Sequence, residues 1–334
     1  MFLSIKGEKN KEMNRNWLRR FRERDDFMVI VVFFVFWFIW LMVSPNLRGI
    51  DSVLDLLRET SPYILTIIGV GVLLIGGEFD LSVGSLLAIV NIVTVFAYKF
   101  TENIWLAILS GLFTGLIIGA INALWVNKLG LSSLVATLAM MFALRGIAFI
   151  TTNRESIVPN IDWPEGMRML YYGSWAKIPI PFVISMTALI ILYFIMSRTS
   201  FGRNVYAIGG NTEAALASGI NIKRTKMILF IISGFLTSIS SLVITGQILT
   251  GYFNLGSQGW EVTAVTACVL GGITLGGGQG TLIGATLGML IINLTHKGLR
   301  LLGVYTTWML VVNGLILIFA LYAYRIRDSI FLRK

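Results

Sequence analysis

The sequence predicts an all-α protein that crosses a membrane about ten times, and three observations support this. First, 56% of the 334 residues are hydrophobic and only 13% are charged, with a mean hydropathy of +0.79. A soluble domain of this length needs far more charge to cover its surface. Second, several uncharged runs reach the ~20 residues that cross ~30 Å of hydrocarbon as a helix. Third, lysine and arginine are distributed unevenly among the connecting segments.

The expected helices follow the uncharged runs in order. The first run begins at Phe27 behind a long charged segment, and no small-residue cleavage site follows Val43, so we expect a retained helix rather than a signal peptide. The two longest runs exceed one helix, and glycines within 246–260 and 271–280 divide them. The ten expected helices are 27–43, 55–76, 83–99, 104–126, 131–151, 179–197, 227–249, 260–271, 280–296 and 303–323.

Basic residues orient these helices. With both termini in the cytoplasm, the cytoplasmic segments hold eighteen of the 27 Lys and Arg residues and the outer loops hold eight. This asymmetry is typical of membrane proteins. We therefore expect a transmembrane domain at 27–324, cytoplasmic ends at 1–26 and 325–334, a cytoplasmic loop at 198–226 and an external loop at 152–178. The external loop carries aromatic residues that suit either a membrane interface or a docking surface, namely Trp163, Tyr171, Tyr172 and Trp175.

The segment GGEFDLSVGS at 76–85 places two carboxylates between apolar runs. Glu78 and Asp80 would point about 200° apart on one helix, so paired acid–base chemistry would need a non-helical turn. Asp80 or Ser82 can instead accept backbone N–H groups at the start of the next helix. Non-helical backbone at membrane depth is buried in protein or lines a water-filled cavity. We therefore expect a shaped turn between two membrane helices that is buried in protein or lines a water-filled cavity at their inner end.

Other polar groups at helix level are also candidates for function, because ionisable groups inside a membrane are rarely incidental. Arg145 lies about two turns from the external end of its helix, where it can snorkel, pair or gate. Glu261 begins the eighth helix, where it can complement the helix N-terminus or act at an external gate. Small polar residues suit either close helix packing or the pathway, among them Asn122, Thr137 and Ser233. The pathway or gate candidates are Glu78, Asp80, Ser82, Ser85, Asn91, Arg145 and Glu261.

The expected cytoplasmic loop contains a short capped helix. Asn211 is a natural N-cap, Glu213 lies in the first turn and Gly219 supplies a C-terminal stop. Such a helix either docks sideways into a groove of a partner protein or simply connects two membrane helices.

Three stretches resemble, in the same order, the signatures of the ribose-type sugar permeases. They are GGEFDLSVGS (76–85), FGRNVYAIGGNTEAALASGINIKRTK (201–226) and AVTACVLGGITLGGGQGTLIGATLG (264–288). The resemblance covers about residues 27–324. This family, which includes ribose, xylose, arabinose, galactose and autoinducer-2 permeases, supplies the membrane subunits of bacterial ATP-binding-cassette (ABC) importers. The resemblance therefore implies a multi-pass protein of the bacterial inner or plasma membrane with the ABC importer permease fold.

The resemblance also implies partners. Two permease subunits, identical or similar, form the pathway. A separate cytoplasmic ATPase subunit binds ATP and magnesium, and a periplasmic or lipid-anchored binding protein delivers a monosaccharide or a related small polyol. The EAA…G pattern of ABC permeases is similar to residues 213–219, although its Ile-x-Leu-Pro ending is absent here. The family's ATPase-coupling role falls on Arg203, Asn204, Asn211, Glu213, Ala214, Ala215, Gly219 and Asn221.

Other function classes have little support. One cysteine, Cys268, and one histidine, His296, predict neither an intramolecular disulfide nor a metal site. No GxxxxGK[ST] phosphate loop occurs, and GGITLGGGQG at 271–280 lacks the lysine, so we interpret it as a close-packed turn. We expect no catalytic residue and no cofactor in this chain. The net charge of +10 fits cytoplasmic loops better than nucleic-acid binding. The alternative is an ion-coupled secondary transporter that uses Glu78, Asp80 or Glu261.

Overall fold

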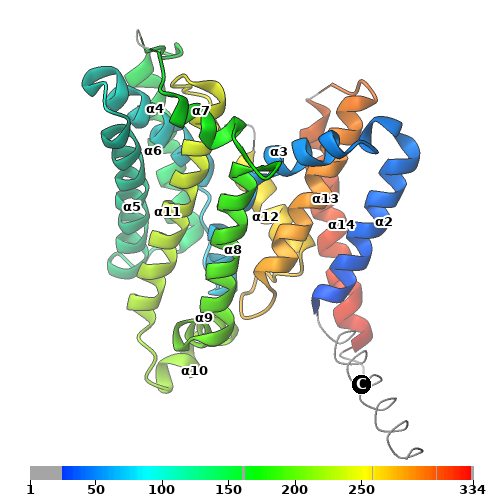
Figure 1. The fold of residues 1–334 in the computed structure, drawn as a ribbon. Coiled ribbons are helices and arrows are strands. Elements are labelled where there is room, and N and C mark those ends of the chain that lie inside the picture. The colour runs from blue at the N-terminus through cyan, green and yellow to red at the C-terminus, as the bar shows by residue number, and fades with distance from the viewer. Residues whose placement is uncertain (1–24, 160–161, 258, 306, 332–334) are drawn as a thin grey trace, which may run out of the picture.

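The chain folds into a bundle of helices (Figure 1). The computed structural model describes residues 25–159, 162–257, 259–305 and 307–331, so the expected segment 1–26 lies almost wholly outside the described residues. The elements are α2 (Asp25–Val43), the 3₁₀ turn η1 (Pro45–Leu47), α3 (Ile50–Ile75), α4 (Val83–Thr101), α5 (Ile104–Lys128), α6 (Ser133–Thr152), α7 (Glu165–Tyr172), β1 (Ser174–Trp175), β2 (Ile178–Pro179), α8 (Ile180–Arg198), α9 (Ser200–Gly210), α10 (Thr212–Ala217), α11 (Ile222–Ile248), α12 (Trp260–Leu270), α13 (Leu282–Leu301) and α14 (Trp308–Phe331).

The membrane-spanning segments match the expected helices in order. In the described part of the chain, seven helices are long and apolar enough to cross a membrane, namely α3, α4, α5, α6, α8, α11 and α13. Three shorter apolar segments accompany them, within α2, α12 and α14. The prediction of a polytopic all-α protein is therefore confirmed, with ten as an approximate count.

Several boundaries differ from the expectation because the helices extend beyond the uncharged runs into polar sequence. The second helix begins at Ile50 rather than at position 55. The helix expected from 227 begins at Ile222, because Asn221 accepts the N–H of Arg224 at 3.0 Å and so caps it before the basic cluster. The expected loop 198–226 is mostly helical, since α9 precedes the short helix that the sequence predicted.

The segment 152–178, expected to be the external loop, also contains more structure than expected. It forms α7 and the small antiparallel pair β1–β2. Trp163 is buried, stacks on Tyr98 with ring centroids 4.2 Å apart, and donates its indole N–H to the Leu249 carbonyl at 2.8 Å. Tyr171 is also buried, so these two aromatics pack the interior, whereas Tyr172 and Trp175 are exposed.

The helices form two groups (Figure 1). One group holds α4, α5, α6, α8 and α11, and the other holds α2, α13 and α14, with α12 between them. Helix α7 lies at one end of the bundle, which we call the α7 end, and α9 and α10 lie at the opposite, α10 end. The first turns of α3 run across the α7 end before the helix enters the bundle, and Pro62 lies within it.

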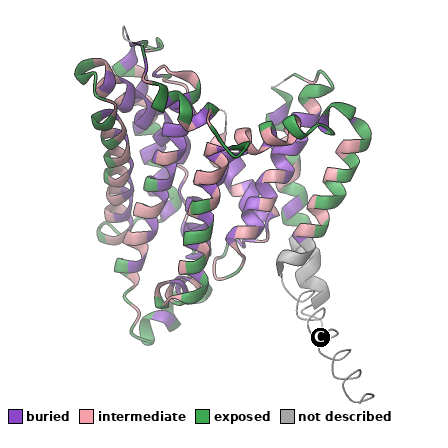
Figure 2. Ribbon diagram, in the orientation of Figure 1, coloured by how far each residue is buried: buried purple, intermediate pink, exposed green. Residues whose placement is uncertain are grey.

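The core is centred on α3 and α11. Nearly every side chain of α3 from Ile64 to Ile75 is fully buried, and Phe230 of α11 is the largest fully buried side chain. Large apolar side chains instead lie exposed along α5, α6, α8 and α14 (Figure 2), among them Phe113, Phe142, Phe194 and Phe319. Such an apolar surface suits contact with lipid or with another membrane subunit.

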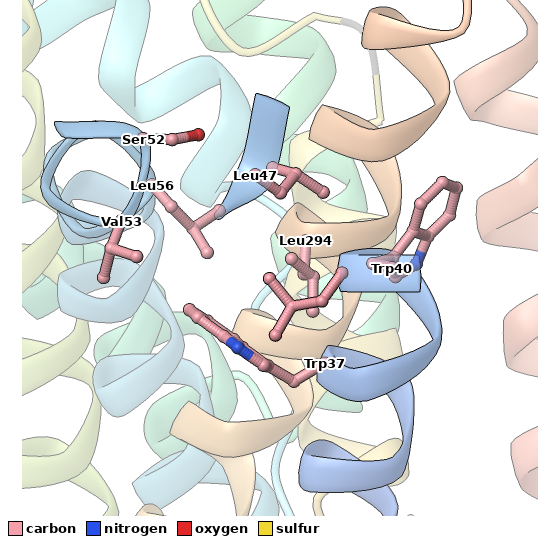
Figure 3. A pocket seen from close by; sticks show the side chains of 8 residues that line it. Trp37, Trp40, Leu47, Ser52, Val53, Leu56 and Leu294 are labelled. Atoms are coloured by element: carbon pink, nitrogen blue, oxygen red, sulfur yellow. The ribbon is translucent and has the colours of Figure 1, made fainter. Parts of the chain in front are cut away.

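Helix α2 is fastened to the second group of helices through an apolar pocket. Trp37 and Trp40 of α2 face Leu47, Leu56 and Leu294 there (Figure 3). Among the described residues, no charged side chain lines this pocket. It is therefore a packing contact between α2, α3 and α13, separate from the polar groups described below.

Ion pairs at the α7 end hold α13 against α3. Glu59 lies 2.6 Å from Arg300 and 3.7 Å from Lys297, and Lys297 also donates to the Ser52 carbonyl at 3.0 Å. These contacts fix the first, lateral turns of α3 to the end of α13.

Glycines bring α5 and α11 into backbone contact. A Cβ atom on Gly115 would overlap the Ser238 hydroxyl and the Gly234 carbonyl, and one on Gly119 would lie 2.5 Å from the Phe230 carbonyl. Small residues at four-residue spacing allow this close approach in membrane helices.

Replacing Gly115 with alanine is expected to destabilise the bundle. The added methyl group must push α11 away, and overpacking of this kind costs about 1–3 kcal/mol. Unfolding of the purified protein in mild detergent, followed by circular dichroism, measures the effect. Gly146→Ala on α6 is the matched control, because a Cβ there meets nothing within 4 Å. Equal stability of the two variants would contradict the packing role.

Candidate functional site

The predicted turn after α3 is a buried segment fixed by side chains from neighbouring helices. Gly77 has a φ of +78°, which closes the C-terminus of α3. The N–H of Phe79 donates to the Ser133 hydroxyl at 3.0 Å. The N–H of Leu81 donates to the Thr137 hydroxyl at 3.1 Å. The first turns of α6 therefore satisfy the backbone that the turn leaves without helical partners.

Asp80 organises the interior of this turn. It is 1% exposed, and its Oδ1 accepts the N–H and the hydroxyl of Ser82 at 3.0 and 2.6 Å. Its Oδ2 accepts the Ser233 hydroxyl of α11 at 2.9 Å. Asn122 of α5 donates to the Ser82 hydroxyl at 3.0 Å. Asp80 thus binds α11 directly and α5 through Ser82. The N–H that it accepts belongs to Ser82, the N-cap residue of α4, rather than to the helix Val83–Thr101 itself. The alternative cap by Ser82 is wrong, because its side chain accepts no N–H of α4.

Glu78 connects the turn to the beginning of α11. It is 6% exposed and forms an ion pair with Lys226. A buried carboxylate needs such a partner, because desolvation of an unpaired charge is costly. The pair ties the turn to the first turns of α11, the helix that follows α10.

Asn91 lies farther along α4 and anchors the segment after α11. Its Oδ1 accepts the N–H of Tyr252 at 2.7 Å, and its Nδ2 donates to the Thr245 hydroxyl at 2.8 Å and to the Thr250 carbonyl at 3.1 Å. Ser85 is 2% exposed, and its hydroxyl has no hydrogen-bond partner among the described residues.

The segment between α11 and α12 folds back into the bundle. Gly256 contacts Gly84 at the first turn of α4, where a Cβ on Gly84 would lie 2.8 Å from the Gly256 carbonyl. Trp260 then stacks on Tyr63 of α3, with ring centroids 3.8 Å apart and an interplanar angle of 10°. Helix α12 therefore begins deep in the bundle. Its 11 residues extend only about 16 Å, roughly half of the hydrocarbon thickness.

This placement corrects the position expected for Glu261. The residue lies beside Gly84 inside the bundle, not at the α7 end. Its Oε2 is buried and accepts no hydrogen bond from the described residues, and the same region holds a buried, unpartnered Nη2 of Arg145. The two charges attract each other, although no ion pair within 4.0 Å joins them in the described structure. Arg145 and Glu261 are both partly exposed.

At the α10 end, the short helix forms as predicted. Asn211 accepts the N–H of Ala214 at 2.9 Å, and Gly219 has a φ of +79°. Ala215 is buried against the protein, whereas Glu213 and Ala214 are exposed, and Leu216 is 64% exposed. The helix therefore presents an apolar side chain and a carboxylate outward. Of the other expected coupling residues, Arg203 and Asn221 are exposed and Asn204 is half-buried.

The glycine-rich segment between α12 and α13 is the close-packed turn that the sequence predicted. Its Gly278 N–H donates to the Ile75 carbonyl at the end of α3 at 2.7 Å. Gly277 lies against Gly77 and Gly209, and Gly278 lies against Gly210. The glycines here permit backbone contact with two other segments.

Two partners of the turn escaped the sequence analysis. Ser133 was not singled out, although its four-residue spacing from Thr137 places both hydroxyls on one face of α6. Lys226 was counted only as one of the basic residues of the cytoplasmic segments. Its own sequence neighbours do not identify Glu78, which is far away in sequence, as its partner.

Comparisons of the sequence with known proteins match a family model and several permeases. A family model described as branched-chain amino acid transport system / permease component matches residues 52–321. The L-arabinose transport system permease protein AraH of Escherichia coli (strain K12) is 33% identical over 296 residues, which cover 89% of each chain. The ribose import permease protein RbsC of Bacillus subtilis (strain 168) is 33% identical over 84% of this chain and 86% of its own. RbsC of E. coli (strain K12) is 30% identical over 83% of this chain and 87% of its own.

Proposed function

This chain belongs to the permease family described as branched-chain amino acid transport system / permease component, and on that premise we propose that it imports a monosaccharide or a related small polyol. It acts as the membrane-spanning subunit of an ABC importer. The observation that carries the proposal is the likeness to arabinose and ribose permeases along most of the chain. ATP hydrolysis then belongs to a separate ATPase subunit, and the chain itself is not an enzyme.

The ion-coupled alternative has less support. Asp80 is engaged by three donors and Glu78 by Lys226, so both carboxylates serve contacts within the protein. The relatives are named as sugar permeases, and AraH of Azospirillum brasilense is named as an ABC transporter permease.

The pathway runs along the face that carries Arg145 and Glu261. Charged side chains within a membrane face a water-filled cavity or another protein rather than lipid. Both residues are partly exposed in the single chain, and Glu261 begins a half-helix. Broken helices of this kind expose polar ends to solutes in other transporters. A second permease subunit, identical or similar, covers this face. The buried candidates hold the helices in register, namely Glu78, Asp80, Ser82, Ser85 and Asn91.

The α10 end docks on the ATPase in the cytoplasm. Leu216 and Glu213 project from α10 and offer an apolar anchor beside a carboxylate. The remaining surface comes from α9 and the start of α11, through Arg203, Asn204, Asn211 and Asn221. The α7 end then faces a periplasmic or lipid-anchored binding protein, and the chain resides in the bacterial inner or plasma membrane.

Reconstitution tests the proposal. Proteoliposomes that contain the permease and the ATPase, supplied with the binding protein, are expected to accumulate labelled sugar only with internal ATP. Uptake that stops with an ionophore and does not need the ATPase would support the secondary transporter instead. Calorimetry on the binding protein then identifies the sugar.

Replacing Glu213 with lysine is expected to uncouple ATP hydrolysis from transport. The change reverses a charge on the exposed helix, and like charges across an interface can weaken it enough to lower uptake about tenfold. Sugar uptake and ATP hydrolysis by the assembled complex measure the uncoupling, and ATPase co-purification measures docking. Glu165→Lys is the matched control for co-purification, because Glu165 also lies in the first turn of a short helix but at the α7 end. Normal uptake by a correctly inserted Glu213→Lys chain would contradict the docking assignment.

A further inference from the structure

Three backbone segments meet at the α10 end without intervening side chains. They are the end of α3, the end of α9 and the segment between α12 and α13. We call the contact of Gly77, Gly209, Gly277 and Gly278 the glycine junction. A Cβ on Gly209 would overlap the Ile75 carbonyl and lie 2.5 Å from the Gly278 nitrogen, so Gly209 sits directly against the Gly278–Ile75 hydrogen bond. A Cβ on Gly277 would lie 2.8 Å from Gly77 Cα and 3.0 Å from Gly209 Cα.

A side-chain bond reinforces the junction. The hydroxyl of Tyr206 on α9 donates to the Gly280 carbonyl at 2.9 Å. Helix α9 therefore holds the segment between α12 and α13 at two places, Gly209 and Tyr206. Beside this segment lies an open hollow of ≈ 440 Å³, also lined by Leu321 of α14.

The junction lies between the outward-facing helix α10 and the half-helix α12. Only Asn211 separates α9 from α10, and its side chain caps α10. On the other side, the segment begins where α12 ends at Leu270, and the first turn of α12 carries Glu261. Packed backbone has no rotamers that could absorb a shift, so a displacement of α9 and α10 must move the segment or break its hydrogen bonds.

We propose that the glycine junction transmits the displacement of α10 to α12 and thereby moves Glu261 within the pathway. The inference rests on the proposed function, in which an ATPase moves α10. Gly209 is a positioning residue in this view: it contacts neither solute nor ATPase, and it sets how closely α9 follows α12.

Alanine at Gly209 tests the transmission. The methyl group separates α9 from the Gly278–Ile75 hydrogen bond, and overpacking of this kind is expected to lower sugar uptake about tenfold. ATP hydrolysis and ATPase co-purification are expected to persist, because α10 keeps its exposed face. Gly210→Ala is the matched control, since a Cβ there meets nothing within 4 Å, and it is expected to transport normally. Normal, fully coupled transport by Gly209→Ala would overturn the proposal.

If the Gly209→Ala variant does not assemble with its partners, distance measurements on a chain that keeps all the junction glycines test the proposal instead. Spin labels at Ser218→Cys after α10, Val262→Cys on α12 and Phe113→Cys on α5 occupy exposed positions, whereas the native Cys268 is buried. On ATP binding, we expect the Ser218–Val262 distance to stay constant while both sites shift relative to Phe113. A shift of Ser218 without Val262 would overturn the transmission but leave the proposed function standing. If the ATPase neither binds nor shifts any site, the proposed function fails, and this inference fails with it.

Discussion

The Asp80→Ala variant is expected to lose about 3 kcal/mol or more of unfolding free energy, because three buried donors lose their acceptor at once. These are the N–H and hydroxyl of Ser82 and the hydroxyl of Ser233. Water cannot replace the carboxylate easily where the site is 1% exposed. Denaturant or thermal unfolding in mild detergent, together with the amount of inserted protein, measures the loss.

Two further variants separate the effect of losing hydrogen bonds from the effect of losing the side-chain volume of Asp80. Asp80→Asn keeps an oxygen toward Ser82 and is expected to lose less stability than Asp80→Ala. Ser233→Ala removes one donor only and is expected to cost about 1 kcal/mol. Asp51→Ala is the control for an exposed carboxylate in a helix first turn. If Asp80→Ala unfolds at the same point as Asp51→Ala, the turn does not depend on this carboxylate.

Replacing Glu261 with lysine is expected to abolish most transport while leaving the chain inserted. The variant places two cations near each other beside the first turn of α4, since Arg145 already interacts electrostatically with Glu261. An uncompensated charge inside a membrane costs about 3 kcal/mol, which corresponds to a loss of about a hundredfold in uptake. Uptake by proteoliposomes with ATPase and binding protein measures the effect.

A charge exchange is the sharpest control for this pair. The double variant Arg145→Glu/Glu261→Arg restores opposite charges and is expected to recover part of the transport that Glu261→Lys loses. Glu102→Lys makes the same charge change at an exposed carboxylate and is expected to leave insertion and ATPase co-purification unchanged. No recovery in a correctly inserted double variant would show that the two residues act independently.

The sequence predicted the spans and the caps because both are local. Apolar runs determine which segments enter the membrane, and the caps at Asn211 and Gly219 depend on residues within one turn of each other. The same locality explains the missed boundaries. Asn221 extends α11 through a charged stretch that hydropathy alone assigns to a loop.

The depth of Glu261 was not predictable from its neighbours. Glycine-rich segments before it indicated a loop, and a loop between two spans is ordinarily placed at the membrane surface. Only the packing of Gly256 on Gly84 and of Trp260 on Tyr63 shows that this segment enters the bundle. These contacts join residues more than 150 positions apart, which no local pattern records.

The sequence by itself determined the class of the protein, the order of its helices and its family. Hydropathy, helix caps and signature stretches each depend on residues that are close together in the sequence. The tertiary structure alone decided which groups meet. It paired Glu78 with Lys226, surrounded Asp80 with three helices and brought three glycine segments into contact. The physical reason is that partners of buried polar groups are chosen by packing in three dimensions, where helices distant in sequence supply the donors.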